Sequence, residues 1–221
     1  MSTFETVRSK LEEWIGRFAA TTAINALKNG VIATLPLTML GSIFLLIASF
    51  PVSNWDAIMT ALMGPDWKYP FTQISGNTFD IIAMASAASI GYQYAKLKGV
   101  EPFACGLISL VNFLALIPST VTSGDVTVGS VISKTWSGGS GMATAIIVAL
   151  LTGWIYTSVL AKGWRIKMPD SVPQGVSDTF SALIPGFLSI LAAFVACAVL
   201  HFVGDTSLAE ILVSILQITL Q

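Results

Sequence analysis

The sequence is short of charge. Of its 221 residues only 10% are Asp, Glu, Lys or Arg, whereas 54% are hydrophobic. An ordinary soluble domain carries about 25% charged residues, and the mean hydropathy here is +0.77. A soluble fold of this size could not cover its surface with so few charged side chains. The composition therefore excludes most soluble enzymes and disordered proteins, and it predicts an integral membrane protein.

The balance of charges and the small number of cysteines exclude further classes of protein. The 11 Lys and Arg residues nearly balance the 12 Asp and Glu residues. The chain therefore has no basic field for nucleic acid, and we expect no nucleic-acid partner. Two cysteines exclude a disulfide scaffold. We expect no metal site and no cofactor.

Charge-free runs predict the membrane helices. Residues 29–55, 102–124, 135–161 and 179–204 hold no charged side chain, and each run exceeds the ~20 residues that cross a bilayer core. A further apolar run covers 76–95, with Asp80 near one end. None shows the alternation typical of barrel strands. We predict an all-α, polytopic integral membrane protein with five transmembrane helices near residues 29–50, 77–95, 102–120, 141–161 and 179–203.

Basic residues predict the orientation, because cytoplasmic loops are enriched in Lys and Arg. With the N-terminus inside, only Lys68 and Lys134 fall outside. The other nine lie on the cytoplasmic side: Arg8, Lys10, Arg17, Lys28, Lys96, Lys98, Lys162, Arg165 and Lys167. We therefore expect a multi-pass protein of the cell membrane with a cytoplasmic N-terminus and an outer C-terminal tail.

The N-terminal segment has a different pattern. Apolar residues recur at helical spacing over residues 3–18, and charged residues fill the opposite face. This pattern is typical of an amphipathic helix on the membrane surface, although a helix that pairs with a partner helix remains an alternative. We divide the chain into a cytoplasmic amphipathic helix (1–27) and a transmembrane domain (28–221).

The connecting segments carry weaker signals. We expect long outer loops over 51–75 and 121–140. The glycine-rich residues 137–141 lack a following Gly-Lys-Ser/Thr, so we interpret them as a flexible turn rather than a phosphate-binding loop. Two prolines stiffen the inner segment 162–178, which is either a rigid loop or a partner-docking loop. Ser177 and Asp178 suit the start of the fifth helix.

No ionisable residue lies at membrane depth, where one would be a functional hypothesis. Asp80 and His201, which lies four residues before Asp205, are both near the outer face. We predict no catalytic residue, and the substrate-binding residues stay unknown. The uncharged amides Asn77, Gln93 and Asn112 either face a polar path or form interhelical hydrogen bonds, and we favour the hydrogen bonds.

Small residues predict close helix packing. They recur every four residues in three stripes: Ala83, Ala87 and Gly91; Ala145, Ala149 and Gly153; and Ser189, Ala193 and Cys197. We expect these stripes to support self-association as well as packing within one chain, and we expect the second to lie in a dimer interface. Cys105 and Cys197 lie too far apart in depth for a disulfide, and we interpret both as core residues. Pro36 and Pro185 should kink their helices.

Two segments carry a family resemblance. The residues Tyr94–Phe103, which read YAKLKGVEPF, and the residues Met168–Gly186, with Met168-Pro169-Asp170-Ser171-Val172-Pro173 followed by Phe180–Gly186, resemble bacterial phosphotransferase-system (PTS) sugar permeases. The matching type is enzyme IIC of the lactose/cellobiose/diacetylchitobiose family. The opening from Phe4 to Pro36 is similar as well.

The resemblance implies a permease that binds a β-linked disaccharide outside and carries it inward. A separate IIB protein, supplied by IIA, would then phosphorylate the sugar. Members are homodimers of about twice this length, and their sugar-binding His and Glu lie in the second half. His201 does not match that His, so no binding residue is carried over. The apolar segment 207–220 is too short to span, and we expect the chain to be the front part of something longer.

Three functions remain open at this point. The first is a sugar permease component, here its N-terminal half, which is not catalytic alone. The second is a transport-incompetent fragment that serves dimerisation or anchoring. The third is an unrelated multi-span carrier of similar composition.

Overall fold

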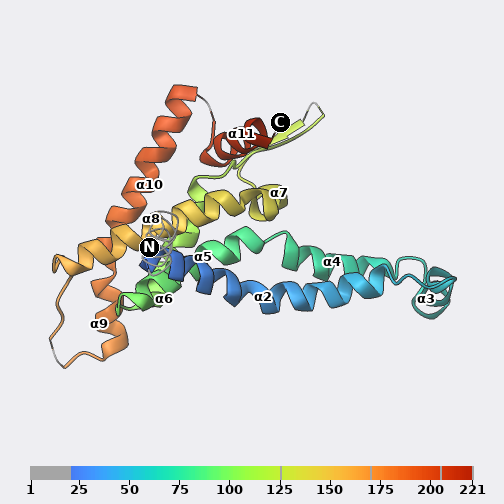
Figure 1. The fold of residues 1–221 in the computed structure, drawn as a ribbon, viewed down its shortest axis with the longest axis horizontal. Helices are drawn as coiled ribbons and strands as arrows, with labels where there is room; N and C mark the ends of the chain where they lie inside the picture. Colours follow the sequence, from blue (N-terminus) through green and yellow to red (C-terminus); the bar gives the residue numbers. More distant parts are fainter. Residues whose placement is uncertain (1–20, 125, 170, 205, 221) are drawn as a thin grey trace, which may run out of the picture.

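Helices dominate the computed structural model, which describes residues 21–124, 126–169, 171–204 and 206–220 (Figure 1). The predicted amphipathic helix over 3–18 lies outside these residues. The elements are, in order, α2 (Thr22–Ala48), α3 (Trp55–Met63), α4 (Lys68–Phe79), α5 (Ile82–Leu97), α6 (Pro102–Ala115), β1 (Val121–Ser123), β2 (Val126–Val128), α7 (Lys134–Ser137), the 3-10 turn η1 (Gly139–Gly141), α8 (Met142–Ala161), α9 (Gln174–Ser181), α10 (Leu183–Gly204) and α11 (Leu208–Leu220).

Three of the five predicted spans form helices long and apolar enough to cross a bilayer. They are Thr22–Ala48, Gly139–Ala161 and Gln174–Gly204. The other two predicted spans are shorter helices, because α5 has 16 residues and α6 has 14. The prediction of an all-α membrane fold is therefore confirmed, but two of the five predicted spans are not among the helices long enough to cross.

Helix ends follow local chemistry. Helix α2 begins at Thr22 because the Thr21 side chain accepts a hydrogen bond from the Ile24 backbone N–H. The predicted domain boundary after residue 27 thus falls inside α2. Helix α6 ends at Ala115 rather than at residue 120. Pro118 disfavours helical backbone at the residue before it, which accounts for the early end.

The predicted outer loop over 51–75 is wrong, because α3 and α4 occupy most of it. Helix α4 lies alongside α2, and together with α3 they form an arm that extends away from the other helices (Figure 1). The predicted span 77–95 begins in α4 and is interrupted by a turn at Asp80–Ile81. The segment 51–75 holds Trp, Tyr and Pro rather than a long apolar run. The length of apolar runs therefore could not predict helices α3 and α4.

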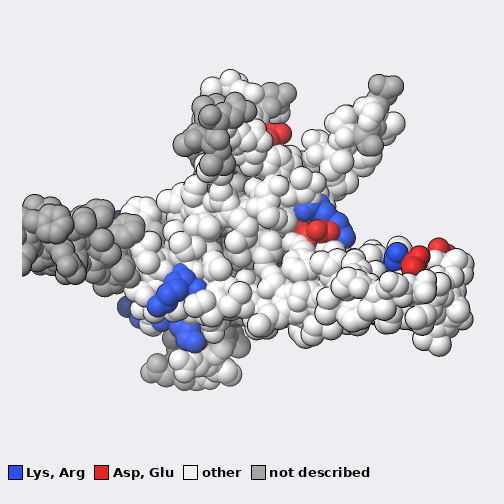
Figure 2. All heavy atoms as spheres, turned by 45° about the vertical axis from the view of Figure 1, so that its right-hand side comes forward, with Lys and Arg blue, Asp and Glu red and all other residues white. Residues whose placement is uncertain are grey.

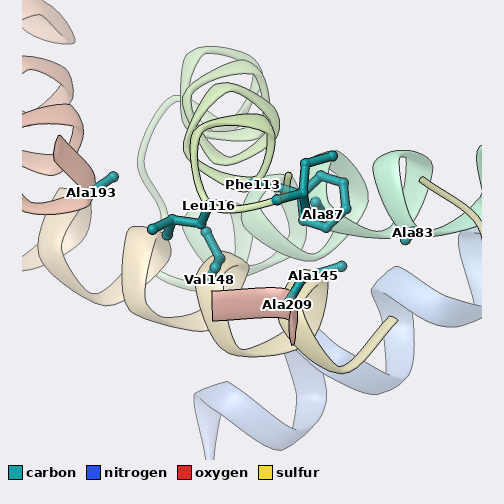
Figure 3. Close-up of a cluster of buried hydrophobic side chains, with 9 residues drawn as sticks. Ala83, Ala87, Phe113, Leu116, Ala145, Val148, Ala193 and Ala209 are labelled. Atoms are coloured by element: carbon teal, nitrogen blue, oxygen red, sulfur yellow. The ribbon is translucent and has the colours of Figure 1, made fainter. Parts of the chain in front are cut away.

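The body of the fold is built on α5, which packs against α2, α6 and α8. A Cβ added to Gly91 would lie 2.6 Å from the Ser109 side chain, and one added to Gly153 would lie 2.5 Å from the Tyr94 ring. These glycines allow the backbones to approach closely. Figure 3 shows the main buried cluster, in which the small residues Ala83, Ala87 and Ala145 occur together with larger ones such as Phe113.

Two small-residue stripes are used up by packing within the chain. Ala83 and Ala87 on α5 and Ala145 and Ala149 on α8 are all fully buried. A second copy cannot reach them, so our placement of the Ala149–Gly153 stripe in a dimer interface is wrong. The cause is that α5 and α8 use these faces against each other.

The predicted loop over 121–140 is not a loop throughout. Strands β1 and β2 form an antiparallel hairpin in which Val121 pairs with Val128. Helix α7 and η1 follow, so the glycine-rich residues are partly helical. A Cβ added to Gly141 would meet the Trp136 carbonyl oxygen. Gly141 therefore permits a tight chain approach, whereas a Cβ added to Gly139 would meet no atom within 4 Å.

The inner segment leads into a helix earlier than predicted. Helix α9 begins at Gln174, with Pro173 as its N-cap residue. Ser177 and Asp178 consequently lie inside α9, and their assignment to the start of the fifth helix is wrong. The helix is interrupted at Ala182. Pro185 has no N–H to offer the Ser181 carbonyl, which accounts for the interruption. Helix α2 stays assigned as one helix through Pro36.

Candidate functional site

Asn112 joins three helices at the centre of the fold. Its Nδ2 donates hydrogen bonds to Thr152 Oγ1 on α8 and to Ser189 Oγ on α10, each at 2.9 Å. All three side chains are buried, and Asn112 Oδ1 has no hydrogen-bond partner. The predicted interhelical role of Asn112 is confirmed. The cluster pins α6, α8 and α10 together.

The other predicted amides do not join it. Asn77 is exposed and Gln93 half-buried, and within the described part of the chain neither side chain forms a hydrogen bond. Asp80 ends α4 and forms an ion pair with Lys134, with 3.4 Å between Oδ2 and Nζ. Asp80 therefore holds α7 against the α4–α5 turn.

The two cysteines have different surroundings. Cys105 is fully buried on α6, as predicted, but Cys197 is exposed on α10, so its assignment to the core is wrong. Both are free thiols. His201 is exposed one turn beyond Cys197, and the predicted neighbour Asp205 lies outside the described residues. In the segments that the structure describes, no group of three or more His, Cys, Asp or Glu residues could hold a metal ion.

A cavity of about 590 Å³ opens at the end that carries the basic residues. Its lining comes from the α5–α6 turn, the last turns of α8, and α9 with the segment before it. The charged residues in it are Lys98, Glu101, Arg165 and Asp178. Both sequence segments that resemble the permeases therefore meet at one place, which sequence reasoning did not foresee.

Local chemistry shapes this cavity. Gly99 adopts a φ of +70° that favours glycine. Glu101 accepts hydrogen bonds from the backbone N–H groups of Phe103 (2.8 Å) and Ala104 (3.0 Å), which caps α6. Ser181 Oγ donates to the Ile166 carbonyl at 3.2 Å and ties α9 to the segment between α8 and α9.

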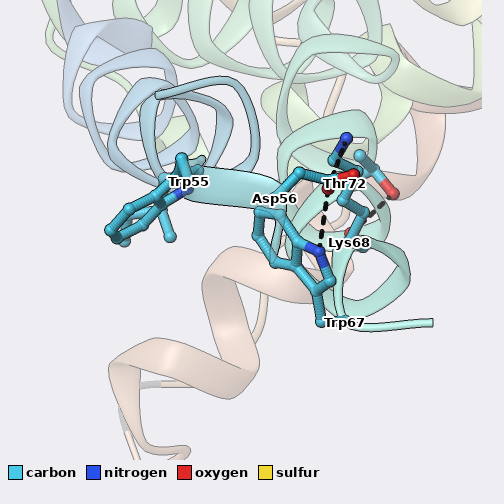
Figure 4. A network of polar contacts seen from close by, with 6 residues as sticks. Trp55, Asp56, Trp67, Lys68 and Thr72 are labelled. Carbon is cyan, nitrogen blue, oxygen red and sulfur yellow. Dashed lines mark hydrogen bonds and ion pairs between the residues drawn. The ribbon is translucent and has the colours of Figure 1, made fainter. Parts of the chain in front are cut away.

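A polar network joins α3 to α4 in the arm (Figure 4). Asp56 accepts a hydrogen bond from Trp67 Nε1 at 3.0 Å and forms an ion pair with Lys68 at 2.9 Å. The hydrogen bond from Lys68, followed by that from Trp67, lowers the pKa of Asp56 below its ordinary value of 3.8. Trp67 is buried beneath the pair, so the network is structural.

Figure 2 shows a surface with few charges, where basic side chains gather in one region and mixed pairs lie further along the molecule. The sequence falls within a known family: the phosphotransferase system EIIC family matches residues 28–220. The chain belongs to this EIIC family.

Named relatives agree with this assignment. The EIIC chain is 34% identical to the putative permease IIC component YwbA of Bacillus subtilis over 96% of its own length and 49% of the relative's. It is 33% identical to the lichenan permease IIC component of Bacillus subtilis, over 89% and 45% of the two chains. It is 31% identical to the cellobiose-specific EIIC component of Geobacillus stearothermophilus, over 84% and 43%.

A solved structure shares the fold. The EIIC chain superimposes on the transporter ChbC, the IIC component of the N,N'-diacetylchitobiose-specific system, with a TM-score of 0.89 and 28% identity. The match covers 97% of this chain and 51% of ChbC. The chain thus spans about half the length of the proteins that it matches.

Proposed function

We propose that this chain is the N-terminal membrane part of a PTS permease for a β-linked disaccharide of the cellobiose or diacetylchitobiose type. The observation that carries the proposal is the superposition of 97% of the chain on ChbC. The relatives named for cellobiose and lichenan support the same sugar class. The charge-poor helices suit the passage of a neutral sugar. Phosphorylation after passage would give a charged product, which cannot return.

The partners of this permease are separate IIB and IIA proteins. IIB acts at the end where the basic residues and the 590 Å³ cavity lie. In this proposal the phosphoryl group comes from the partner IIB. The chain alone, supplied with IIB, IIA and the phosphoryl donor, should make no sugar phosphate above background.

The experiment that tests the function is an in-frame disruption of the gene in its own host. Uptake and donor-dependent phosphorylation of cellobiose, diacetylchitobiose and lactose are then measured. We expect loss of one or more of these activities and restoration by the intact gene. Unchanged uptake of the whole sugar panel would contradict the proposal.

The orientation follows from the same proposal, with the N-terminus and Gly163 inside and the β-hairpin outside. In a chain lacking Cys105 and Cys197, single cysteines at Thr122 and Gly163 should differ in their reaction with an impermeant maleimide on intact cells. Only the Thr122→Cys variant should react. Labelling of Gly163→Cys alone would reverse the topology.

An anchoring or dimerisation fragment is the second candidate, because the chain spans only about half of its relatives. DNA sequencing downstream of the codon for Gln221 separates the two. An in-frame continuation with a His and a Glu at membrane depth favours the permease. A fragment would leave uptake unchanged on disruption but lower the amount of an associated permease in the membrane.

We also propose that the permease is a homodimer. Large apolar side chains stand exposed on α2, such as Met39 at 67% and Leu40 at 59%. A second copy that contacts the arm would cover them. This surface replaces the α8 stripe as the candidate interface.

A further inference from the structure

A second cavity, of about 440 Å³, lies at the opposite end of the body from the basic residues. Three elements meet there: the end of α6 with the chain that follows it, the last turns of α10, and the start of α11. The lining residues are Ala115–Thr120, Cys197, Leu200, His201, Thr206, Ser207 and Glu210. We call it the outer cavity. Its volume falls in the range of small-molecule sites, about 300–1,000 Å³.

Its lining is divided by chemistry. Leu116, Ile117 and Leu200 give apolar surface, and the first two are themselves buried in the core. The hydroxyl groups of Ser119, Thr120, Thr206 and Ser207, the His201 ring and the Glu210 carboxylate give polar surface. A ligand that fits presents both C–H faces and hydroxyl groups, and a sugar ring has both.

The polar wall is organised around Glu210. Its Oε2 accepts hydrogen bonds from the Ser207 N–H (2.8 Å), Ser207 Oγ (2.9 Å) and Thr206 Oγ1 (3.2 Å). The Glu210 N–H in turn donates to Ser207 Oγ at 3.3 Å, so the two residues form a capping box that fixes the start of α11. The carboxylate is thus held in place, and these three bonds use only one of its oxygens.

The charge of the cavity selects a neutral ligand. Helices α6 and α10 both end here, and a helix C-terminus carries partial negative charge. Glu210 adds a full negative charge and offsets the positive end of α11. These groups disfavour an anion such as a sugar phosphate. A metal cation has no second acidic ligand among the described lining residues.

We propose that the outer cavity is a binding site for a neutral sugar, occupied before the sugar enters the membrane. The inference rests on the proposed function and deepens it, because it places a first sugar contact in this half of the permease. Hydroxyl groups of the sugar donate to Glu210 and to the carbonyl ends of α6 and α10. The apolar wall contacts the face of the ring.

The test uses a reporter that the chain already has. Cys197 lines the cavity and is exposed, whereas Cys105 is fully buried, so a maleimide should label Cys197 alone. The chain is placed in lipid nanodiscs without glycoside detergent, and cellobiose or diacetylchitobiose is added. We expect saturable protection of Cys197, with labelling slowed at least fivefold. Equilibrium dialysis with radiolabelled cellobiose checks binding directly.

Two matched variants locate the site. Thr120→Trp fills the cavity and should raise the sugar concentration for half-protection at least tenfold. Thr122→Trp places the same ring two residues away, outside the lining. This variant should change the sugar concentration for half-protection less than twofold. His201→Ala, at an exposed side chain, should weaken binding two- to tenfold, as expected for one lost hydrogen bond. Cellobiose phosphate should protect at least tenfold more weakly than cellobiose.

Several results would overturn the proposal. The first is the absence of saturable protection and binding in the parent chain. The second is an equal loss in Thr120→Trp and Thr122→Trp, and the third is no loss in any of Thr120→Trp, Thr122→Trp and His201→Ala. The fourth is equal binding of the phosphorylated sugar. Loss of uptake on gene disruption together with no binding here rejects only the outer cavity. Binding here together with unchanged uptake rejects the proposed function instead.

Discussion

Helices α2 and α8 are both long and apolar, yet they are buried in different ways. In the most apolar stretch of α8, 44% of the residues are buried inside the fold, compared with 17% in α2. The difference follows from side-chain size, because α8 turns Ala145, Ala149 and Gly153 toward α5, whereas α2 presents large apolar side chains outward. In a bilayer, apolar character does not drive helices together, and close packing of small residues does. The body is therefore held by small residues, and the large residues of the arm are left for lipid or another copy.

The largest loss of stability is expected when a small residue in the body is enlarged. A Cβ at Gly153 would lie 2.5 Å from Tyr94 Cγ and 2.7 Å from Tyr94 Cβ. We expect Gly153→Ala to lower the free energy of unfolding by about 1–3 kcal/mol, because overpacking forces the backbones of α5 and α8 apart. Thermal unfolding of the purified chain in micelles measures the change.

The matched control is Gly175→Ala on α9, where an added Cβ meets no atom within 4 Å. Replacing a helical glycine by alanine should be neutral or stabilise by up to about 1 kcal/mol. If both variants unfolded like the parent, the close approach of α5 and α8 would not limit stability.

How far the sequence anticipates this packing depends on the residue. Charge-free runs place α8 and α10 within a few residues, because bilayer thickness fixes the length of an apolar helix. Helix α2 begins earlier than its predicted span, at Thr22, and contains the charged Lys28. The stripes on α5 and α8 correctly indicate close packing, but a stripe does not reveal which helix it contacts. The same limit applies to Cys197. It lies at the end of a stripe that begins with buried Ser189, yet Cys197 itself is exposed.

The candidate sites were less predictable. Both cavities are lined by segments far apart in the chain, such as the α6 end and the α11 start, and only the tertiary fold brings these together. Helices α3 and α4 were not predicted either, because their Trp- and Tyr-containing segment has no apolar periodicity over a full span. The capping box of Ser207 and Glu210 was readable in principle from the Ser-x-x-Glu spacing before an apolar run.

The second prediction concerns the polar link within the body. Asn112→Leu removes both hydrogen bonds to Thr152 and Ser189, and the two hydroxyl groups can then turn to carbonyls of their own helices. Interhelical hydrogen bonds in membranes are worth about 0.6 kcal/mol each on average. We therefore expect a loss of about 1–2 kcal/mol in thermal unfolding.

Asn77→Leu provides the comparison in the arm, because the Asn77 side chain is exposed and forms no hydrogen bond within the described chain. Its free energy of unfolding should stay within about 0.5 kcal/mol of the parent's. An equal loss in both variants would mean that the Asn112 cluster contributes nothing specific.

The third prediction tests what covers the arm. Met39→Ala and Leu40→Ala truncate side chains that are already exposed, so the free energy of unfolding should change by less than about 0.5 kcal/mol. If a second copy contacts α2, both variants should nevertheless lower the cross-linked dimer fraction in native membranes. Phe187→Ala, exposed at 66% on α10, is the control and should leave the dimer fraction unchanged. A parent chain that stays monomeric would reject the homodimer.

The smallest expected effect concerns the polar network that ties α3 to α4 in the arm. Hydrogen bonds from Lys68 and Trp67 lower the pKa of Asp56 below 3.8 in the folded chain. Its ionised form therefore stabilises the fold fully above pH 3.8, and this contribution is lost as the pH falls through the lowered pKa. The pair is largely exposed, so the effect is small and salt should weaken it further. We expect the difference in unfolding temperature between the parent and Asp56→Asn to be present at pH 6 and to shrink toward pH 3. A parent–variant difference that stays constant from pH 6 to pH 3 would mean that the Asp56 charge does not hold the arm, and that Trp67 packing alone joins α3 to α4.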